Sequence, residues 1–581
     1  MTNQEIAEIL RQVYELMQLA GENRFRAIAF DRAAQTIEGL NDDINHYIEN
    51  ETLTDIKGIG KSIAEDITAY AETGTMPVLE NLKKRVPKGL IEWLDISGLG
   101  PKNIVKIHQK LGITEIDELK EACQSGAVAD LPGLGEKSAQ KILKSIKWLE
   151  QFGERCRLDQ AMKIAEPVYE FLKGLEGLQQ ISIAGSLRRR KETIGDVDIL
   201  ISADDKHTES IFDAFTNHEL VTEILGRGST KSSIRTEEGR QVDLRIVKPD
   251  QYPAALMYFT GSKEHNVVLR QRARDRKMAL NEYGLFELDN EGNTDFDKLV
   301  KTESEAGIYK KLDLYFIPPE HREDRGEFEF YSENEKMPLV EETDIRGVIH
   351  AHSTWSDGKY SIREMAEACI EKGYEYLGIT DHSKSAAYAG GLTEDKVRQQ
   401  WEEIDRLNEE YSKKQFRIFK GIESDILSNG SLDYPDSLLE GFDFVIASVH
   451  SGLDMPPEKM LGRFRKAAEH PATRIIGHPT GRLLLKRDGN NFDINKLIDY
   501  AVEHNTAIEI NANPRRFDLD WRYGYKAKEA GLLTSVNPDA HTTDGIDDIR
   551  YGVMIARKAK FDKERVLCAW PAGKLEKWFK G

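Results

Sequence analysis

The chain has 581 residues and a mass of 66.0 kDa, enough for about three or four domains of ordinary size. Its 81 Lys and Arg residues against 100 Asp and Glu residues give a formal charge of −19, which excludes a uniformly basic surface but not local binding of nucleic acid. Four cysteines without a Cys-x-x-Cys pair exclude a disulfide scaffold, and the absence of a signal pattern or a long apolar run predicts a soluble, cytoplasmic protein.

Apolar residues recur at helical spacing through residues 1–150 and predict an all-α region. One pattern occurs there three times, at residues 55–67, 95–107 and 130–142: a Gly-apolar-Gly turn that leads into a helix. Such a turn leaves backbone amides free at the start of a helix, where phosphate binds well. One copy alone fits an ordinary helix cap, whereas three copies favour binding of a phosphate backbone. The glycines concerned are Gly58, Gly60, Gly98, Gly100, Gly133 and Gly135.

Residues from about 160 to 320 predict strands mixed with helices. Asp196 and Asp198 lie two residues apart on one predicted strand and therefore point to one face, and Asp243 has an equivalent place on another strand. If the strands are neighbours, three carboxylates converge and need cations between them, for which two Mg²⁺ ions that serve phosphoryl transfer are the usual solution. The alternative is a strand end with solvated acids, which a lone Asp-x-Asp also fits.

Three runs of sequence favour the first interpretation: GSLRRRKETIGDVD, VDLR and YFTGSKEHNVVLR. Together they resemble the nucleotidyltransferase core of the family X DNA polymerases, the family of polymerase beta, and the three turns resemble its helix-hairpin-helix elements. The resemblance implies that Asp196, Asp198 and Asp243 hold two catalytic Mg²⁺ or Mn²⁺ ions, and that Asp243 assists deprotonation of the primer 3′-OH. It also implies DNA and dNTPs as ligands, and a monovalent cation at the helix-hairpin-helix turns.

The same resemblance assigns residues to the incoming nucleotide and the template. They are Ser186, Arg189 and Gly195 for the β and γ phosphates, Tyr258, Phe259 and Gly261 for the sugar, Asn266 for the nascent base pair and Arg270 for the template strand. One position departs from the family. The lysine of polymerase beta that forms an imine with 5′-deoxyribose phosphate aligns with Asp66, so lyase activity at this position is not expected; Lys61, one turn away, is the alternative.

Residues 318–344 hold ten acidic residues and begin with Pro-Pro, and we expect a solvated linker or hinge. Beyond it, short apolar strands alternate with helices to about residue 575, which predicts a βα barrel or a doubly wound sheet. Imidazoles and carboxylates fall at the ends of these strands, the usual place of a barrel active site, and suit Zn²⁺, Mn²⁺ or Fe²⁺. A lone histidine is usually structural, whereas nine such groups favour a metal centre.

The motifs HxH, TDH, GxE, SxH, GHP and DxH in residues 345–575 resemble the PHP (polymerase and histidinol phosphatase) family. The family fold is a distorted βα barrel of seven strands with up to three metal ions. The implied ligands are His350, His352, Glu423 and Asp539 for one ion, Glu423, His450 and His478 for a second, and Asp357, His382 and His541 for a third.

The expected multi-domain fold comprises an N-terminal helix-hairpin-helix domain (1–80), a second helical subdomain (81–150), an α+β palm (151–252), a thumb (253–317), the acidic linker (318–344) and an α/β PHP barrel (345–575). This combination resembles the bacterial and archaeal type of family X polymerase. It implies a nucleoid-associated monomer that fills gaps in base excision repair and has a Mn²⁺-favoured 3′→5′ exonuclease or 3′-end-processing activity. Two alternatives remain: a PHP half that is a phosphatase for a small phosphoester, and a non-catalytic DNA-binding scaffold.

Overall fold

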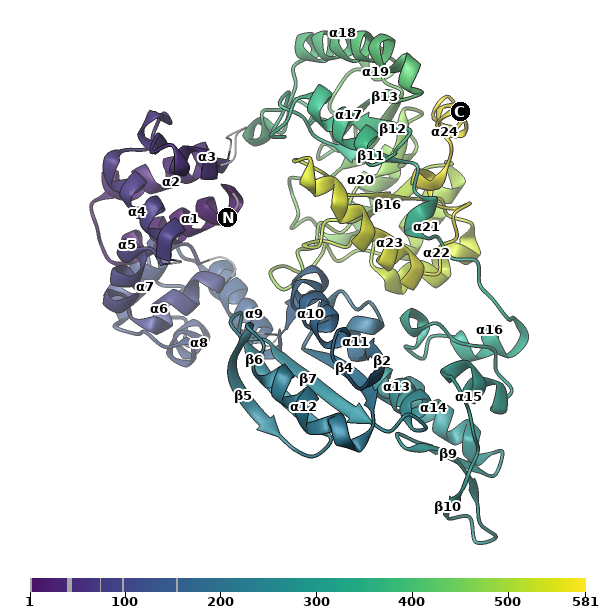
Figure 1. The fold of residues 1–581 in the computed structure, drawn as a ribbon. Helices are drawn as coiled ribbons and strands as arrows, with labels where there is room; N and C mark the ends of the chain where they lie inside the picture. The colour runs from purple at the N-terminus through teal and green to yellow at the C-terminus, as the bar shows by residue number, and fades with distance from the viewer. Residues whose placement is uncertain (1–2, 39–43, 74, 97–98, 153–154) are drawn as a thin grey trace. The chain divides into compact units, whose positions relative to one another are not determined.

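The computed structural model describes residues 3–38, 44–73, 75–96, 99–152 and 155–581. The chain forms two compact units, Met1–Gly153 and Glu154–Gly581 (Figure 1). Among the helices in the described ranges, none combines the length and the apolar character that a membrane span needs.

The first unit is helical, as predicted. Its described hydrophobic residues form two cores, one between residues 6 and 82 and one between residues 86 and 146. The helices are α1 (Asn3–Leu19), α2 (Arg24–Glu38), α3 (Ile44–Glu49), α4 (Lys61–Thr73), α5 (Pro77–Arg85), α6 (Lys88–Glu92), α7 (Pro101–Leu111), α8 (Ile116–Gln124) and α9 (Glu136–Phe152).

The second unit begins with a palm, a five-stranded sheet in the order β2-β4-β7-β6-β5. Strands β4 and β7 are parallel and the other neighbours are antiparallel. The alternate apolar residues of β4 and β7 are buried in a core with those of α10 and α12, which leaves the intervening acidic residues for the opposite face. The elements are β1 (Cys156–Arg157), α10 (Leu158–Lys173), β2 (Leu178–Ile183), α11 (Gly185–Arg188), β3 (Thr193–Ile194), β4 (Asp196–Ala203), α12 (Asp205–Thr216), β5 (Val221–Arg227), β6 (Lys231–Thr236) and β7 (Gln241–Val247).

A thumb follows, in which helices pack with a small antiparallel sheet in the order β10-β9-β8. His265, on the basic helix of this region, is buried and bonded to Glu327 and the Tyr309 hydroxyl at 2.8 and 2.9 Å, so its role here is structural. The elements are α13 (Tyr252–Thr260), α14 (Lys263–Arg274), β8 (Met278–Asn281), β9 (Gly284–Leu288), β10 (Thr294–Leu299) and α15 (Glu305–Lys311).

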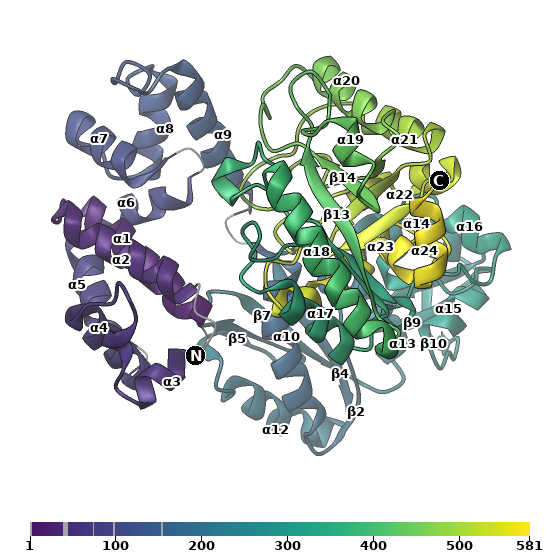
Figure 2. The ribbon, with the colours of Figure 1, turned by 90° about the horizontal axis from the view of Figure 1, so that it is seen from above.

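The C-terminal part is a barrel of seven parallel strands in sequential order, β11 to β17, with helices around it (Figure 2). An isolated parallel bridge between Ala351 and Ala540 joins the first strand to the residues after the last, so the barrel is nearly closed. The strands are β11 (Gly347–Ala351), β12 (Tyr376–Ile379), β13 (Arg417–Asp425), β14 (Phe444–Ser448), β15 (Thr473–Ile476), β16 (Ala507–Asn511) and β17 (Thr534–Asn537). The helices are α17 (Ile362–Glu371), α18 (Glu394–Tyr411), α19 (Asp436–Leu439), α20 (Pro457–Ala468), α21 (Ile494–Glu503), α22 (Gly524–Ala530), α23 (Ile549–Lys558) and α24 (Ala572–Phe579).

The acidic segment 318–344 differs from the solvated linker that its composition predicts. It contains a helix, α16 (Glu327–Glu333), and buries Glu320, Arg322 and Glu327. Some of its acids are paired with cations from other parts of the unit: Arg557 of α23 lies 2.8 Å from Glu320, and Lys558 lies 2.8 Å from Glu323. Others, such as Glu333 and Glu335, are exposed, as the composition predicts. Composition could not reveal these partners, because they lie far away in the sequence.

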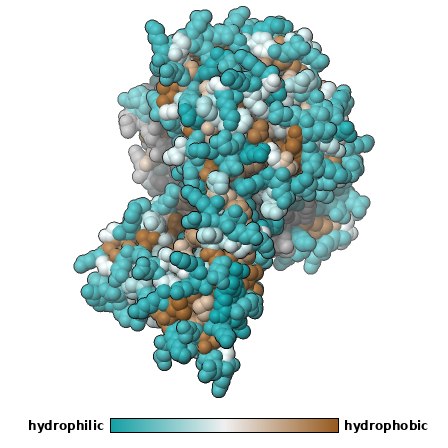
Figure 3. Space-filling view, turned by 90° about the vertical axis from the view of Figure 1, so that its right-hand side faces the viewer, coloured by the Kyte–Doolittle hydropathy of each residue, from teal (hydrophilic) through white to brown (hydrophobic). Residues whose placement is uncertain are grey.

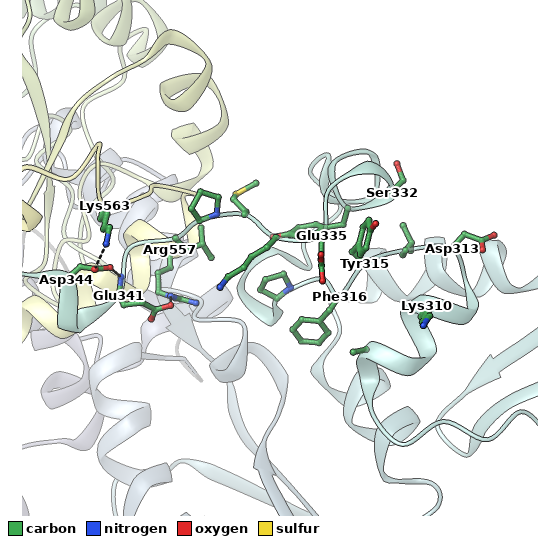
Figure 4. Close-up of a pocket in the computed structure, with 18 residues that line it drawn as sticks. Lys310, Asp313, Tyr315, Phe316, Ser332, Glu335, Glu341, Asp344, Arg557 and Lys563 are labelled. Carbon is green, nitrogen blue, oxygen red and sulfur yellow. Dashed lines mark hydrogen bonds and ion pairs between the residues drawn. The ribbon is translucent and has the colours of Figure 1, made fainter.

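A hollow of about 1310 Å³ lies along this segment, lined by residues of the thumb, the segment and the barrel (Figure 4). Its barrel end carries charge, with Lys563 3.3 Å from Asp344, and its thumb end carries the aromatic residues Tyr315 and Phe316. Figure 3 shows the right-hand side of the view in Figure 1, where the surface is mostly hydrophilic and small hydrophobic patches occur in both the upper and the lower part. The segment links the thumb to the barrel along one side of this hollow.

Candidate metal centres and DNA-binding turns

Three carboxylates meet on the palm sheet, because the condition that the strand pattern left open is met. Strands β4 and β7 are neighbours, and their register places Asp198 directly opposite Asp243. Oxygen atoms of Asp196, Asp198 and Asp243 all lie within 4.8 Å of one another, which is the spacing of ligands that share metal ions. The alternative interpretation, a single strand end whose acids are only solvated, does not describe this cluster, which comes from two neighbouring strands.

The three carboxylates repel one another, so positive charge nearby would stabilise their ionised forms. Burial, and then the carboxylates of Asp196 and Asp243, raise the pKa of Asp198 to about 7. Burial also opposes the charge of Asp243, but hydrogen bonds from Lys231, Ser233 and Gln241 lower its pKa. The Lys231 ammonium lies 2.6 Å from Asp243, where it supplies part of the positive charge that the cluster needs.

Gly185 makes room for this cluster. It has φ +61°, and a Cβ atom built on it would lie 2.2 Å from Oδ2 of Asp198. The glycine at the start of the GSLRRRKETIGDVD run therefore allows the backbone to pass directly beside the Asp198 carboxylate. Gly195, predicted to contact phosphate, immediately precedes β4, and Ser186 lies in the short helix α11.

Arg189, the predicted phosphate ligand, has protein partners in this structure. Its guanidinium donates to Glu323 at 3.1 Å and to the carbonyl oxygen of Thr260 at 2.5 Å. A triphosphate would therefore have to displace Glu323 from Arg189. The barrel holds the same loop, since the buried Lys558 donates to the Arg189 carbonyl oxygen at 2.9 Å and to Glu323 at 2.8 Å.

The residues predicted to bind the sugar, the base pair and the template lie together where α13 meets α14. Tyr258 and Phe259 form an edge-to-face pair with ring centres 5.2 Å apart, directly before Gly261. The Asn266 amide donates to the Tyr258 carbonyl oxygen at 2.8 Å, and the Arg270 guanidinium donates to the Asn266 carbonyl oxygen at 3.3 Å. The Arg270 side chain is exposed and that of Asn266 is half-buried.

Two arginines, Arg272 of α14 and Arg276 just after this helix, contact the protein itself. Arg272 donates to the Leu312 carbonyl oxygen at 2.6 Å, and Arg276 lies 2.9 Å from the Asp313 carboxylate. These contacts tie α14 to the loop after α15.

The three Gly-apolar-Gly turns of the first unit share one backbone hydrogen bond. In each, the amide of the central apolar residue donates to the carbonyl oxygen three residues earlier, in the pairs Ile59–Ile56, Leu99–Ile96 and Leu134–Leu131. Gly58 and Gly133 have φ +100° and +78°, which only glycine adopts readily; Gly98 lies outside the described residues.

A helix begins directly after the second glycine of each turn, α4 after Gly60, α7 after Gly100 and α9 after Gly135. A Cβ atom built on any of these three glycines would meet nothing within 4 Å. The start of each helix therefore faces open space, as an anion site requires.

Asp66 lies on α4, where the family places the imine-forming lysine. It is half-buried, and burial raises its pKa even though the guanidinium of Arg26 opposes this. The alternative, Lys61, is exposed on the same helix and lies 4.0 Å from Glu65.

All nine predicted metal ligands of the barrel gather at the carboxyl ends of its strands. Ligand atoms within 4.8 Å of one another form three overlapping groups: His350, His352 and Glu423; His382, Glu423 and His450; and His352, Asp357, His382 and His541. His478 and Asp539 adjoin these groups, with His478 2.9 Å from Glu423 and Asp539 3.1 Å from His352. Glu423 belongs to two of these groups. His382, which the resemblance assigned to the third ion and not to the ions held by Glu423, has its Nδ1 atom 3.0 Å from Oε2 of Glu423.

This centre combines buried charges that stabilise one another. Burial opposes the charge of Glu423, but the imidazoles of His450, His382 and His350 hold its pKa well below the usual range. Burial likewise opposes the charge of His450, yet Glu423 and Asp425 raise its pKa to about 10. Such a cluster needs cations, either protons or metal ions.

The donor set fits divalent metal ions. Buried nitrogens of His350 (Nε2) and His352 (Nδ1) have no hydrogen-bond partner among the described residues, yet lie 3.6 and 3.7 Å from oxygens of Glu423 and Asp357. These are separations at which two ligands can share one ion. Imidazoles mixed with carboxylates suit Zn²⁺, Mn²⁺ or Fe²⁺.

Two further acidic residues support the ligands and were missed from the sequence. The buried Glu509 of β16 bonds to Nδ1 of His350 at 2.7 Å and accepts from the His478 amide at 2.8 Å. Asp425 bonds to Nδ1 of His450 at 3.1 Å. A signal was available, because Glu509 interrupts the apolar strand Ala-Ile-Glu-Ile and Asp425 is two residues from Glu423 on the same strand.

The sequence matches family descriptions along most of its length. They are helix-hairpin-helix domain (residues 1–76), SAM-like helix-hairpin-helix tandem (90–147), DNA polymerase beta palm (158–247), DNA polymerase beta thumb (255–323) and PHP domain (349–513).

Several known proteins are similar in sequence to all or part of this chain. DNA polymerase/3′-5′ exonuclease PolX of Bacillus subtilis (strain 168) is 39% identical over 582 aligned positions, which cover 100% of each chain. DNA polymerase lambda of Rattus norvegicus is 24% identical over 55% of each chain. A probable phosphatase of Thermoanaerobacter sp. (strain X514) is 28% identical over 40% of this chain and 93% of its own. Among solved structures, a ternary P/T complex of Leishmania infantum polymerase beta is 24% identical, covers 41% of this chain and 98% of its own, and has a TM-score of 0.27.

Proposed function

The chain belongs to the family X DNA polymerases that carry a C-terminal PHP domain, and we propose that it fills short gaps in DNA during base excision repair and trims 3′ ends. The convergence of three carboxylates on neighbouring palm strands, in a chain that also keeps nine metal-ligand side chains in its barrel, carries this proposal. A scaffold without catalysis would have no use for either set.

In the palm, two Mg²⁺ or Mn²⁺ ions would be held by Asp196, Asp198 and Asp243. Asp243 would assist deprotonation of the primer 3′-OH, and hydrogen bonds from Lys231 and Gln241 favour the charged form that metal binding and this role both need. Arg189 would give up its hydrogen bond to Glu323 and bind the triphosphate of the dNTP instead. When bound, divalent cations at both centres supply positive charge that draws in and neutralises the phosphate under attack.

In the barrel, up to three Mn²⁺, Zn²⁺ or Fe²⁺ ions would be held by the nine predicted ligands. The substrate proposed for this centre is the terminal phosphodiester at a 3′ end, which makes the second activity a 3′→5′ exonuclease. The named activities of the Bacillus subtilis relative support it, since that protein aligns with the whole of this chain.

The partners proposed are gapped or primer-template DNA and dNTPs. The three helix-hairpin-helix turns would bind the DNA backbone through amides, with a monovalent cation at the turn, which explains DNA binding by a chain of charge −19. We propose a monomer that acts at the nucleoid in the cytoplasm.

A 5′-labelled primer on a one-nucleotide-gapped template in Mn²⁺, with and without dNTPs, tests both activities. We expect Asp198→Ala to lose extension but keep shortening, and His350→Ala to lose shortening but keep extension. Extension by the wild type without any shortening would contradict the exonuclease assignment.

A second candidate for the barrel is a phosphatase that acts on a small phosphoester. The likeness of residues in this half to the probable phosphatase of Thermoanaerobacter favours it. In that case the wild type would hydrolyse mononucleotides in preference to 3′ ends of DNA.

A further inference from the structure

An exposed aromatic ring stands beside the barrel metal centre. Tyr388 is 75% exposed, and the centre of its ring lies 6.4 Å from that of the predicted ligand His382. Its neighbours Ala386 and Ala389 are buried, and so is Leu392 at the end of the same loop. The ring itself contributes little to the core and is accessible to a bound molecule.

The loop that carries Tyr388 is fixed in place. The Leu392 amide donates to the His382 carbonyl oxygen at 2.9 Å, and the Gly391 amide donates to the Ala386 carbonyl oxygen at 3.1 Å. A Cβ atom built on Gly391 would lie 2.0 Å from the Ser383 carbonyl oxygen, so the two ends of the loop are in close contact. The backbone therefore presents the ring in a defined position relative to the ligand His382.

A hollow of about 390 Å³ opens beside the ring and reaches the metal centre. Tyr388 forms one wall, His450 and its partner Asp425 lie in the lining, and Ser428 and Asn429 supply polar groups at the edge. This volume lies in the range of small-molecule sites and suits one nucleoside.

We propose that Tyr388 and this hollow bind the terminal nucleobase of a DNA 3′ end, which places the terminal phosphodiester at the barrel metal centre. The proposal rests on the exonuclease function proposed above. A base stacks on an aromatic ring whatever its identity, so a tyrosine gives affinity without sequence preference, as trimming of arbitrary 3′ ends requires. Loss of one such stacking contact lowers affinity by roughly tenfold or more.

The test compares two primers in Mn²⁺, one with an ordinary 3′-terminal nucleotide and one with a 3′-terminal tetrahydrofuran residue that has no base. The variants are Tyr388→Ala, Tyr388→Phe and, as a matched control on the same barrel, Tyr525→Ala, whose side chain is 56% exposed on α22. We expect Tyr388→Ala to lower kcat/KM about tenfold on the ordinary primer, mainly through KM, and to leave cleavage of the base-free terminus unchanged. Tyr388→Phe and Tyr525→Ala should behave as the wild type.

An equal loss on both primers would overturn the inference, because Tyr388 would then act on something other than the base, and no loss on either would overturn it too. A wild type that shortens neither primer would contradict the exonuclease function itself, and this inference with it.

Discussion

A buried carboxylate between two arginines offers a quantitative test of how the palm and thumb are held together. Glu305 of α15 receives two hydrogen bonds from Arg188, at 3.0 and 2.7 Å, and one from Arg322 at 2.6 Å. Arg322 is completely buried, and Arg188 belongs to the loop that carries the predicted phosphate ligands. Replacement of Glu305 by glutamine keeps the shape and removes the charge that both guanidinium groups need.

The pKa of Glu305 sets the magnitude. Burial opposes its charge, yet Arg322 and Arg188 lower its pKa from an ordinary 4.5 to about 2. Because each pKa unit corresponds to about 1.4 kcal/mol, the charged form gains about 3 kcal/mol from its surroundings. Breaking a buried ion pair from one side costs a similar amount, about 3–5 kcal/mol. We therefore expect Glu305→Gln to lower the free energy of unfolding by about 3 kcal/mol at pH 7.

The matched control is Glu410→Gln. Arg363 also donates two hydrogen bonds of 2.7 Å to Glu410, but that pair is about half exposed and screened by solvent, so its loss should lower the free energy of unfolding far less. Urea unfolding followed by circular dichroism measures both. Equal effects of the two substitutions would refute the reasoning, since burial is what distinguishes the pairs.

The pH dependence has a definite sign. A carboxylate whose folded pKa is depressed stabilises the fold above its unfolded pKa, and this stabilisation is lost as the pH falls through the folded pKa. The difference between the wild type and Glu305→Gln should therefore be full at pH 6 to 7 and shrink from about pH 4.5 towards about pH 2. A constant difference over that range would contradict the assignment of the effect to ionised Glu305.

Three other predictions concern the two centres. Gly185→Ala should reduce nucleotide addition at least about 100-fold, because its Cβ would lie 2.2 Å from Asp198, while Gly226→Ala, with nothing within 4 Å, should not; primer extension measures both. Glu509→Gln should raise the Mn²⁺ concentration needed for half-maximal 3′ trimming about 10- to 100-fold, because it weakens the support of His350. Removal of divalent metal by a chelator should abolish extension and trimming, and added Mn²⁺ should restore both; activity that persists in a metal-free preparation would contradict the metal requirement.

Much of the fold could be predicted from local patterns. The alternation around Asp198 and Asp243 predicted two strands that each present acids on one face, and the structure shows that these strands, β4 and β7, are neighbours in register. The strand-end histidines likewise predicted polar side chains gathered at one end of a barrel, and the structure brings them together there. These predictions succeeded because period-2 alternation and strand-end placement are local properties of the sequence.

What local patterns could not reveal are contacts between distant segments. Glu323 meets Lys558, which lies 235 residues further along the chain, and Glu192 accepts a hydrogen bond from Trp521 at 2.7 Å. The acidic composition of residues 318–344 predicted solvation, because a sequence shows the acids but not the cations that the fold brings to them. The sequence could not predict the hydrogen bond from Arg189 to Glu323 for the same reason, since the two residues lie 134 positions apart.

The proposed function requires two separate metal centres in one chain that act on the same primer terminus. Conversion of a labelled dNTP to dNMP on gapped DNA in Mn²⁺ measures both at once, because that conversion requires incorporation at the palm and excision at the barrel. We predict steady dNMP formation by the wild type that needs DNA and is abolished by Asp198→Ala and by His350→Ala. Formation of dNMP without DNA, or at an undiminished rate in either variant, would contradict the proposed function.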